Sequence, residues 1–364
     1  MNLAQRLPAE ILYQDQLTAL IAADRDSKPH HWQLSPKAVR TFLLGADKPI
    51  GGQTIQRKIY GNDAAVERAI VTLLGQQGLL LVGEPGTAKS LLSELLSAAI
   101  CGNSTYTVQG SAGLFEENIR YSWNYAALLQ SGPTLKAMVP GPLYQAMSQG
   151  AIMRFEELTR CPTEVQDSLI PILSDRILHI PEIKSEHNYL LSQPGFNIIA
   201  TANLNDRGVN PLSSALKRRL NFEVLQPLSQ RKDRIHLVME QVNSRLHQDA
   251  VDIQVDLATI DILMTVFDEL KSGLVSGVAI QTPSTLLSLP EGINLAYHAA
   301  MQCHYFGDKA LTPGHLATFM TGAVIKDNPK DQEALSDYLR VVRRQRKDDL
   351  LWMQFLDGCR HAGL

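Results

Sequence analysis

The segment Gly83–Ser90 has the residue types of a loop that binds phosphate. It reads Gly-Glu-Pro-Gly-Thr-Ala-Lys-Ser, follows the apolar run Gly78–Val82 and precedes a stretch of good helix formers. Glycines let backbone N–H groups approach phosphate oxygens, and the following helix would direct its free N–H groups and its dipole at the same anion. Lys89 can reach the terminal phosphates, and the Ser90 hydroxyl can coordinate Mg²⁺. The pattern therefore predicts a site for a nucleoside triphosphate.

One position departs from the usual phosphate-loop pattern, because Ala88 stands where a glycine is common. The alternative is a tight strand–helix turn with a solvated lysine, but the apolar run and the helix on either side favour the phosphate loop. The residues expected to contact the nucleotide are Gly83, Glu84, Pro85, Gly86, Thr87, Ala88, Lys89, Ser90 and Leu91.

Two adjacent carboxylates, Glu156 and Glu157, end the mostly apolar run Ala151–Phe155. Hydrolysis of a nucleoside triphosphate needs one carboxylate near Mg²⁺ and another that orients or deprotonates the attacking water. Adjacent residues at a strand end can point to different sides. We therefore expect Glu156 to bind the metal together with Ser90, and Glu157 to activate water. The alternative is a pair of exposed carboxylates where a strand leaves its sheet.

Further polar residues follow in the same part of the chain. The buried-type strand Phe196–Asn203 ends in an amide that can hydrogen-bond the γ-phosphate or the attacking water. A simple turn residue is the alternative for Asn203. Arg218 and Arg219 belong to a basic cluster that can complete a neighbouring subunit's site in an oligomeric nucleotidase. The alternative for these arginines is a solvated helix end.

The elements that position these residues alternate between short apolar runs and longer amphipathic stretches. Candidate strands are Leu79–Val82, Tyr106–Gln109, Ala151–Phe155, Asn197–Ala200 and Phe222–Leu225. Candidate helices between them are Ser90–Ile100, Glu164–Leu173 and Leu212–Arg219. Beyond residue 226 helical spacing dominates, in Arg231–Leu246, Leu257–Lys271, Thr285–Phe306 and Gln332–Phe355. This order predicts a parallel α/β sheet followed by a helical domain.

The composition is that of an ordinary globular protein. The 364 residues are 45% hydrophobic with a formal net charge of −3, which excludes disordered, collagen-like and disulfide-dense classes. The near-neutral charge provides no general attraction to nucleic acid. Four cysteines without close spacing indicate free thiols in a cytoplasmic protein. No run approaches the roughly 20 apolar residues that a membrane span needs, and the first residues do not form a signal peptide.

The order of these motifs resembles that of AAA+ ATPases, and their details resemble the MoxR family, in particular its YehL-like branch. The similar segments are the phosphate loop with its Ala88, Tyr60–Asn62, Gly141–Tyr144, Glu157–Arg160 and Asn197–Asn203. The resemblance implies an α/β phosphate-loop AAA+ core with a five-stranded parallel sheet, followed by an α-helical lid domain. It also implies that Tyr60 and Gly61 touch the adenine.

The sequence pattern divides the chain into an N-terminal helical region (1–55), a nucleotide-binding α/β domain (56–225), which the resemblance covers, and a helical lid (226–364). The resemblance implies hydrolysis of ATP with Mg²⁺ in a homo-hexamer, in which Arg218 or Arg219 reaches the next subunit. MoxR proteins are described as chaperones that remodel or mature a client protein, for example by inserting a cofactor or metal. They often act beside a partner with a von Willebrand factor A domain.

Two departures from the family leave alternatives open. Glu156 replaces the usual metal-binding aspartate, and the segment Gln281–Leu286 aligns with the second sensor but contains no arginine. A nucleotide-dependent binding scaffold with little or no hydrolysis is therefore one alternative. A ring ATPase that acts on DNA is another, against which the near-neutral charge argues.

Overall fold

The computed structural model describes residues 6–184, 188–204, 206, 208–284, 287–306, 310–326 and 328–364. The chain forms two compact units, of which the first ends at Pro227 and the second begins at Leu228. Each unit has its own hydrophobic core. None of the helices in the described ranges combines the length and the hydropathy that crossing a lipid bilayer requires.

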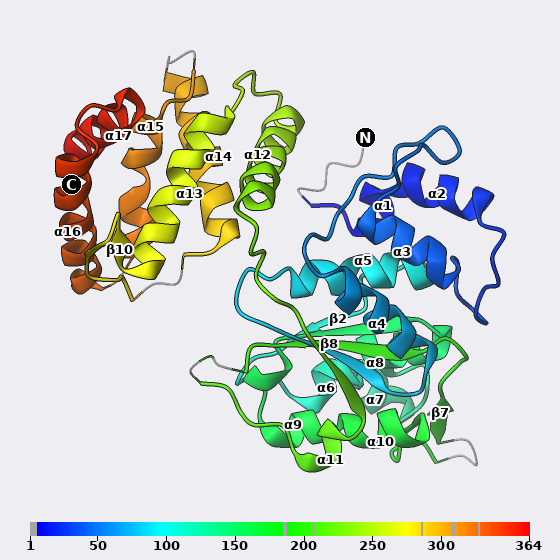
Figure 1. Ribbon diagram of the computed structural model, residues 1–364. Coiled ribbons are helices and arrows are strands. Elements are labelled where there is room, and N and C mark those ends of the chain that lie inside the picture. Colours follow the sequence, from blue (N-terminus) through cyan, green and yellow to red (C-terminus); the bar gives the residue numbers. More distant parts are fainter. Residues whose placement is uncertain are drawn as a thin grey trace. The chain divides into compact units, whose positions relative to one another are not determined.

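A five-stranded parallel sheet forms the centre of the first unit (Figure 1). Its order is β2-β5-β8-β1-β9. The strands are β1 (Gly78–Val82), β2 (Thr107–Gln109), β5 (Ile152–Glu156), β8 (Asn197–Ala202) and β9 (Leu220–Val224). Every pairing between them is parallel, so their carboxyl ends meet at one edge. The predicted sheet is confirmed.

Helices cover both faces of this sheet (Figure 1). One face carries α4 (Asp63–Leu74) and α5 (Lys89–Cys101). The other carries α8 (Pro142–Gln149), α9 (Thr163–Asp167), α10 (Leu169–Asp175) and α11 (Ser214–Lys217). Because successive strand residues point to opposite faces, Leu79 packs in the first layer and Leu80 in the second. The sequence pattern predicted no helix at α4, and it predicted α9 and α10 as one helix. Pro171 separates them, since it has no N–H to donate to the oxygen four residues earlier.

The N-terminal residues pack on the layer that contains α5. They form α1 (Ala9–Leu12), α2 (Gln14–Ala23) and α3 (Pro36–Leu44). Leu34 and Phe42 are buried in the same hydrophobic cluster as Leu92 and Leu95 of α5. The Glu10 carboxylate also accepts hydrogen bonds from the backbone N–H and the hydroxyl of Ser104, which follows α5. The N-terminal region therefore supports the helix that begins in the predicted phosphate loop.

Short elements outside the main sheet complete the first unit. Two antiparallel pairs join β3 (Tyr121–Trp123) with β4 (Met138–Pro140) and β6 (Ile177–His179) with β7 (Tyr189–Leu191). The short helices α6 (Glu116–Ile119) and α7 (Tyr125–Ser131) accompany the first pair.

The second unit is mainly helical. It contains α12 (Arg231–Gln248), α13 (Leu257–Ser272), α14 (Leu289–Phe306), α15 (Pro313–Thr318), α16 (Pro329–Gln345) and α17 (Leu350–His361), with the two-residue strands β10 (Leu274–Val275) and β11 (Val278–Ala279). Phe267, Tyr338 and Phe355 are buried in its core. The predicted helix Gln332–Phe355 is two helices, because the Asp349 carboxylate caps the backbone N–H groups that begin α17.

Candidate functional site

The loop after β1 turns sharply because two of its residues have left-handed backbones. Gly86 has a φ of 82° and Ala88 a φ of 64°. Ala88 is the residue immediately before α5. The left-handed conformation costs an alanine about 1 kcal/mol and a glycine almost nothing, which explains why glycine is common at this position.

Lys89 begins α5 and lies against the loop. Its Nζ donates hydrogen bonds to the backbone oxygens of Gly83 at 2.8 Å and Glu84 at 2.9 Å. Burial lowers the pKa of the Lys89 ammonium, while the negative charges of Glu157 and Glu156 act in the opposite direction. The cation is therefore close to both the loop and the acidic pair.

Glu156 ends β5, is 5% exposed and is held through both carboxylate oxygens. Its Oε2 accepts hydrogen bonds from Ser90 Oγ at 2.6 Å and Thr201 Oγ1 at 2.8 Å. Its Oε1 accepts from Ser93 Oγ at 2.6 Å and Arg154 Nη2 at 2.7 Å. Burial alone would raise the pKa of Glu156, but the three hydroxyls and the arginine charge together hold it below its ordinary value. Glu156 is therefore ionised at neutral pH.

Ser90 and Glu156 have the donor chemistry that Mg²⁺ prefers. Both present hard oxygens, and Oε2 of the ionised carboxylate lies within 2.6 Å of the Ser90 hydroxyl. The extra methylene of a glutamate does not prevent this contact. No cluster of three histidine, cysteine or acidic side chains occurs in the described ranges. This donor set fits Mg²⁺, which keeps water and phosphate oxygens as ligands instead of requiring an all-protein cage.

Glu157 follows the strand with a left-handed backbone, at a φ of 54°. Its N–H donates to Thr201 Oγ1 at 3.0 Å, and Arg160 Nε lies 3.6 Å from its Oε2. Among the described residues, this buried Oε2 has no hydrogen-bond partner. Its polar neighbour is the Arg160 guanidinium, so this carboxylate is held by an ion pair without a hydrogen bond among the described residues.

Gly110 lies against the backbone of the acidic pair. Its N–H donates to the backbone oxygen of Glu156 at 2.7 Å. A Cβ at this position would lie 2.2 Å from the backbone oxygen of Glu157. No side chain fits there, so this glycine permits the close approach of two chain segments.

Asn203 follows β8, which lies between β1 and β5. The pairing of Val82 with Ala202 places Asn203 level with the start of the loop. The sheet thus brings together five of the predicted residues at its carboxyl edge: Lys89, Ser90, Glu156, Glu157 and Asn203.

The two predicted arginines lie at the other end of the sheet. They precede β9, whose first residue, Leu220, pairs with Gly78 at the start of β1. The length of β1, about 13 Å, separates them from the phosphate loop. Arg219 donates to Ser174 Oγ and, at 2.9 Å, to the backbone oxygen of Ala215, whereas Arg218 is exposed. The structure therefore does not bring either arginine to the site of its own chain.

The Tyr60–Asn62 segment is attached to the chain that leaves β9. Asn62 Oδ1 accepts from the N–H of Gln226 at 2.9 Å, and its Nδ2 donates to the Gln226 oxygen at 3.0 Å. The preceding residue, Leu225, donates to Val82, directly before the loop. Tyr60 and Gly61 thus lie on the loop side of the sheet, and Leu91 is 39% exposed on the first turn of α5.

Several residues around the acidic pair were not predicted as site residues. They are Ser93, Gly110, Arg154 and Thr201. Two of them had a signal in the sequence. Arg154 lies two residues before Glu156 and so shares its face of the strand, and Ser93 lies one helical turn after Ser90.

The segment expected to hold a second sensor lies in the second unit. Ser284 donates its backbone N–H and its hydroxyl to the buried Asp331 carboxylate, at 2.7 and 2.8 Å. Thr285 and Leu286 lie outside the described residues.

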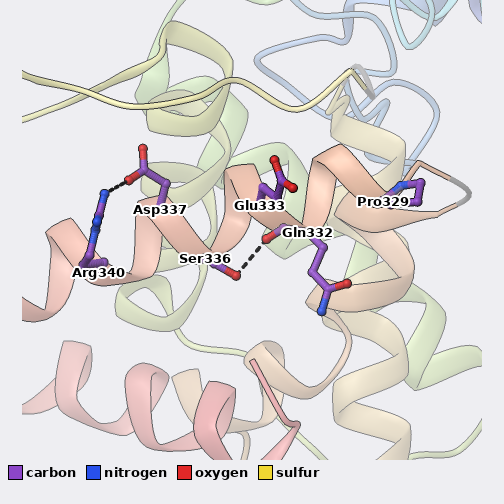
Figure 2. Close-up of a pocket in the computed structure, with 6 residues that line it drawn as sticks. All are labelled: Pro329, Gln332, Glu333, Ser336, Asp337 and Arg340. Carbon is purple, nitrogen blue, oxygen red and sulfur yellow. Dashed lines mark hydrogen bonds and ion pairs between the residues drawn. The ribbon is translucent and has the colours of Figure 1, made fainter.

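The second unit also has a surface hollow of about 600 Å³ along α16 (Figure 2). Within it Asp337 pairs with Arg340, and Ser336 donates to the Gln332 oxygen. The lining of this hollow therefore contains no nucleophile–base pair, and we assign it no role.

Two family models match separate parts of the chain. Residues 78–220 match a model described as an AAA domain of the dynein-related subfamily, and residues 232–362 match the C-terminal domain of YehL-like AAA+ ATPases. The chain is 42% identical over 337 residues to the uncharacterised protein YehL of Escherichia coli K12, covering 93% of this chain and 92% of that protein.

Two further proteins are similar to the chain at lower sequence identity. The chain is 28% identical over 171 residues to the chaperone MoxR1 of Mycobacterium tuberculosis, covering 47% of this chain and 41% of MoxR1. Among solved structures, NtrX from Brucella abortus in complex with ATP has 17% identity and a TM-score of 0.48, covering 81% of this chain and 61% of NtrX.

Proposed function

Since the chain belongs to the family of YehL-like AAA+ ATPases, we propose that it binds ATP with Mg²⁺ and hydrolyses it. The observation that carries this proposal is the convergence of Lys89, Ser90, Glu156 and Glu157 at one edge of the sheet. Bound Mg²⁺ supplies charge neutralisation at the phosphates. Ser90 and Glu156 would hold it.

The remaining residues have separate tasks in this proposal. Lys89 binds the terminal phosphates, and Glu157 accepts a hydrogen bond from the attacking water and takes its proton. Asn203 orients the γ-phosphate or the water. Arg218 completes the site of a neighbouring subunit, since it is exposed while Arg219 is bonded within its own chain.

The substitution Glu157→Gln tests the catalytic assignment. It preserves the size of the side chain and removes its basicity, so ATP should still bind while release of phosphate stops. Glu164→Gln is the matched control, because Glu164 is an exposed glutamate on α9. Hydrolysis near the parental rate in Glu157→Gln would disprove the assignment.

We further propose that ATP turnover remodels or matures a client protein in a homo-hexameric ring, together with a von Willebrand factor A partner. The naming of the relative MoxR1 as a chaperone supports the action on a client protein. Light scattering of Glu157→Gln with ATP should give the mass of six subunits, and a monomer would contradict the ring. A von Willebrand factor A protein encoded beside this chain should co-purify with it.

A nucleotide-dependent scaffold without appreciable hydrolysis is the second candidate. It is favoured by the absence of arginine from Gln281–Leu286, where the Ser284 side chain instead binds Asp331. Steady-state phosphate release from the purified protein separates the two candidates, because a scaffold binds ATP without continuous release.

A further inference from the structure

Arg154 is a buried arginine in the strand that ends at Glu156. It is 8% exposed, and none of the proposed catalytic tasks uses it. It lies two residues before Glu156, so both side chains leave the same face of β5. A buried guanidinium is unfavourable unless it is paired and hydrogen-bonded, so its position requires an explanation.

The guanidinium of Arg154 is bonded at all three of its nitrogens. Nη2 donates to Glu156 Oε1 at 2.7 Å and to the backbone oxygen of Ser90 at 3.2 Å. Nε donates to Ser93 Oγ at 3.0 Å, and Nη1 donates to the backbone oxygen of Ser104 at 3.1 Å. These contacts fix the guanidinium between the first turns of α5 and the chain that follows this helix.

The two carboxylate oxygens of Glu156 accept hydrogen bonds from different donors. Arg154 and Ser93 both donate to Oε1, at 2.7 and 2.6 Å, while Ser90 donates to Oε2. A glutamate has one more rotatable bond than an aspartate, so its carboxylate has more freedom to turn away from a metal. Bonds from a fixed guanidinium to one oxygen remove this freedom.

We propose that Arg154 is a positioning residue that holds Glu156 in the orientation required for Mg²⁺, an inference that rests on the proposed binding of Mg²⁺ with ATP. Arg154 restrains Oε1 and thereby keeps Oε2 beside the Ser90 hydroxyl. It also offsets the charge of a buried carboxylate. The arginine and the longer acidic side chain thus act together as one metal-binding unit.

The test measures how strongly Mg²⁺ increases the affinity of the full chain for a fluorescent ATP analogue. The readout is the ratio of the Kd in EDTA to the Kd in Mg²⁺, which does not depend on hydrolysis. Arg154→Met should reduce this ratio about tenfold, as expected for loss of a hydrogen bond to a charged group. Arg154→Lys should lose about threefold, since lysine keeps the charge without the guanidinium geometry.

A double-mutant cycle shows whether Arg154 acts through Glu156. Glu156→Gln should also reduce the ratio, and adding Arg154→Met to Glu156→Gln should cause no further loss. If the two substitutions instead lower the ratio independently, so that their separate losses multiply in the double variant, the proposal is overturned. If Arg154→Met does not fold, the same cycle with Arg154→Lys decides.

Arg176→Met controls for the removal of a partly buried, hydrogen-bonded guanidinium from the first unit. Arg176 donates to the backbone oxygens of Phe196 and Gln76, away from the acidic pair. This variant should lose thermal stability and keep the Mg²⁺ ratio. Folded Arg154 variants with an unchanged ratio would overturn the inference alone, whereas a parent protein that binds no ATP would overturn the proposed function.

Discussion

The Ser90 hydroxyl donates a 2.6 Å hydrogen bond to Oε2 of Glu156, which lies 66 residues further along the chain. Ser90 is in the first turn of α5, and Glu156 is the last residue of β5. The bond thus joins the phosphate loop to the acidic pair across two elements. It makes the hydroxyl part of the proposed metal site as well as part of the loop.

Ser90→Ala should reduce ATP turnover on the order of a hundredfold, because it removes one Mg²⁺ ligand and one of the bonds that orient Glu156. Ser90→Thr retains the hydroxyl and should retain most of the activity. Ser97→Ala is the control, since Ser97 is a buried serine of the same helix whose hydroxyl donates to the Ser93 backbone. Phosphate release at saturating ATP is the measurement, and a fully active Ser90→Ala would exclude the metal role.

Gly110→Ala should destabilise the first unit by about 1–3 kcal/mol, because its new Cβ would overlap the backbone of Glu157. Turnover should fall more than ATP affinity, because the displaced residues are the two glutamates and not the residues of the phosphate loop. Gly113→Ala should change neither the stability nor the turnover, because no described atom lies within 4 Å of the Cβ it would add. Urea unfolding and phosphate release compare the two variants. Equal effects of both substitutions would contradict this role for Gly110.

Arg218→Ala should abolish turnover without loss of stability if this exposed side chain completes a neighbour's site. Mixing Arg218→Ala with Glu157→Gln should then restore part of the activity, because some interfaces combine an intact Glu157 with an intact Arg218. A mixture of Lys89→Ala with Glu157→Gln is the control. Both of these substitutions damage the same half of the site, so no activity should return. An Arg218→Ala mixture that stays inactive argues against action between subunits.

Lys58 should make the stability of the first unit depend on pH. Its ammonium donates to Gln16 Oε1 and to the Phe42 oxygen, and burial lowers its pKa from 10.5 to about 7. Between these values the unfolded chain binds more protons than the folded chain, so the free energy of unfolding rises with pH. Below about pH 7 both states hold the proton, and the buried charge then lowers the free energy of unfolding by its full amount.

The comparison with Lys58→Met isolates this effect. The parent protein should gain stability relative to Lys58→Met between about pH 7 and about pH 10 in urea unfolding. Lys37→Met serves as the control, because the Lys37 side chain is 78% exposed. A stability difference between the parent and Lys58→Met that does not change with pH would show that Lys58 does not titrate in this range.

The amino-acid sequence was sufficient to predict the sheet, the helical second unit and the glycine-containing loop between β1 and α5. Each of these depends on local patterns: apolar runs of strand length, helical periodicity, and a contiguous set of glycines with a lysine and a serine. The boundary between α9 and α10 was missed because helical spacing hid the effect of Pro171. The roles of the site residues remain predictions until the substitutions are measured.

Only the folded chain decided which side chains surround the acidic pair and which arginine is exposed. Arg154, Ser93 and Thr201 converge on Glu156 from β5, α5 and β8. Ser93 and Thr201 lie 63 and 45 residues from Glu156 in the chain, so neither composition nor periodicity shows that they meet it. Arg218 and Arg219 are adjacent and chemically identical, and they differ only because the packing of α10 and α11 provides bonds to one of them.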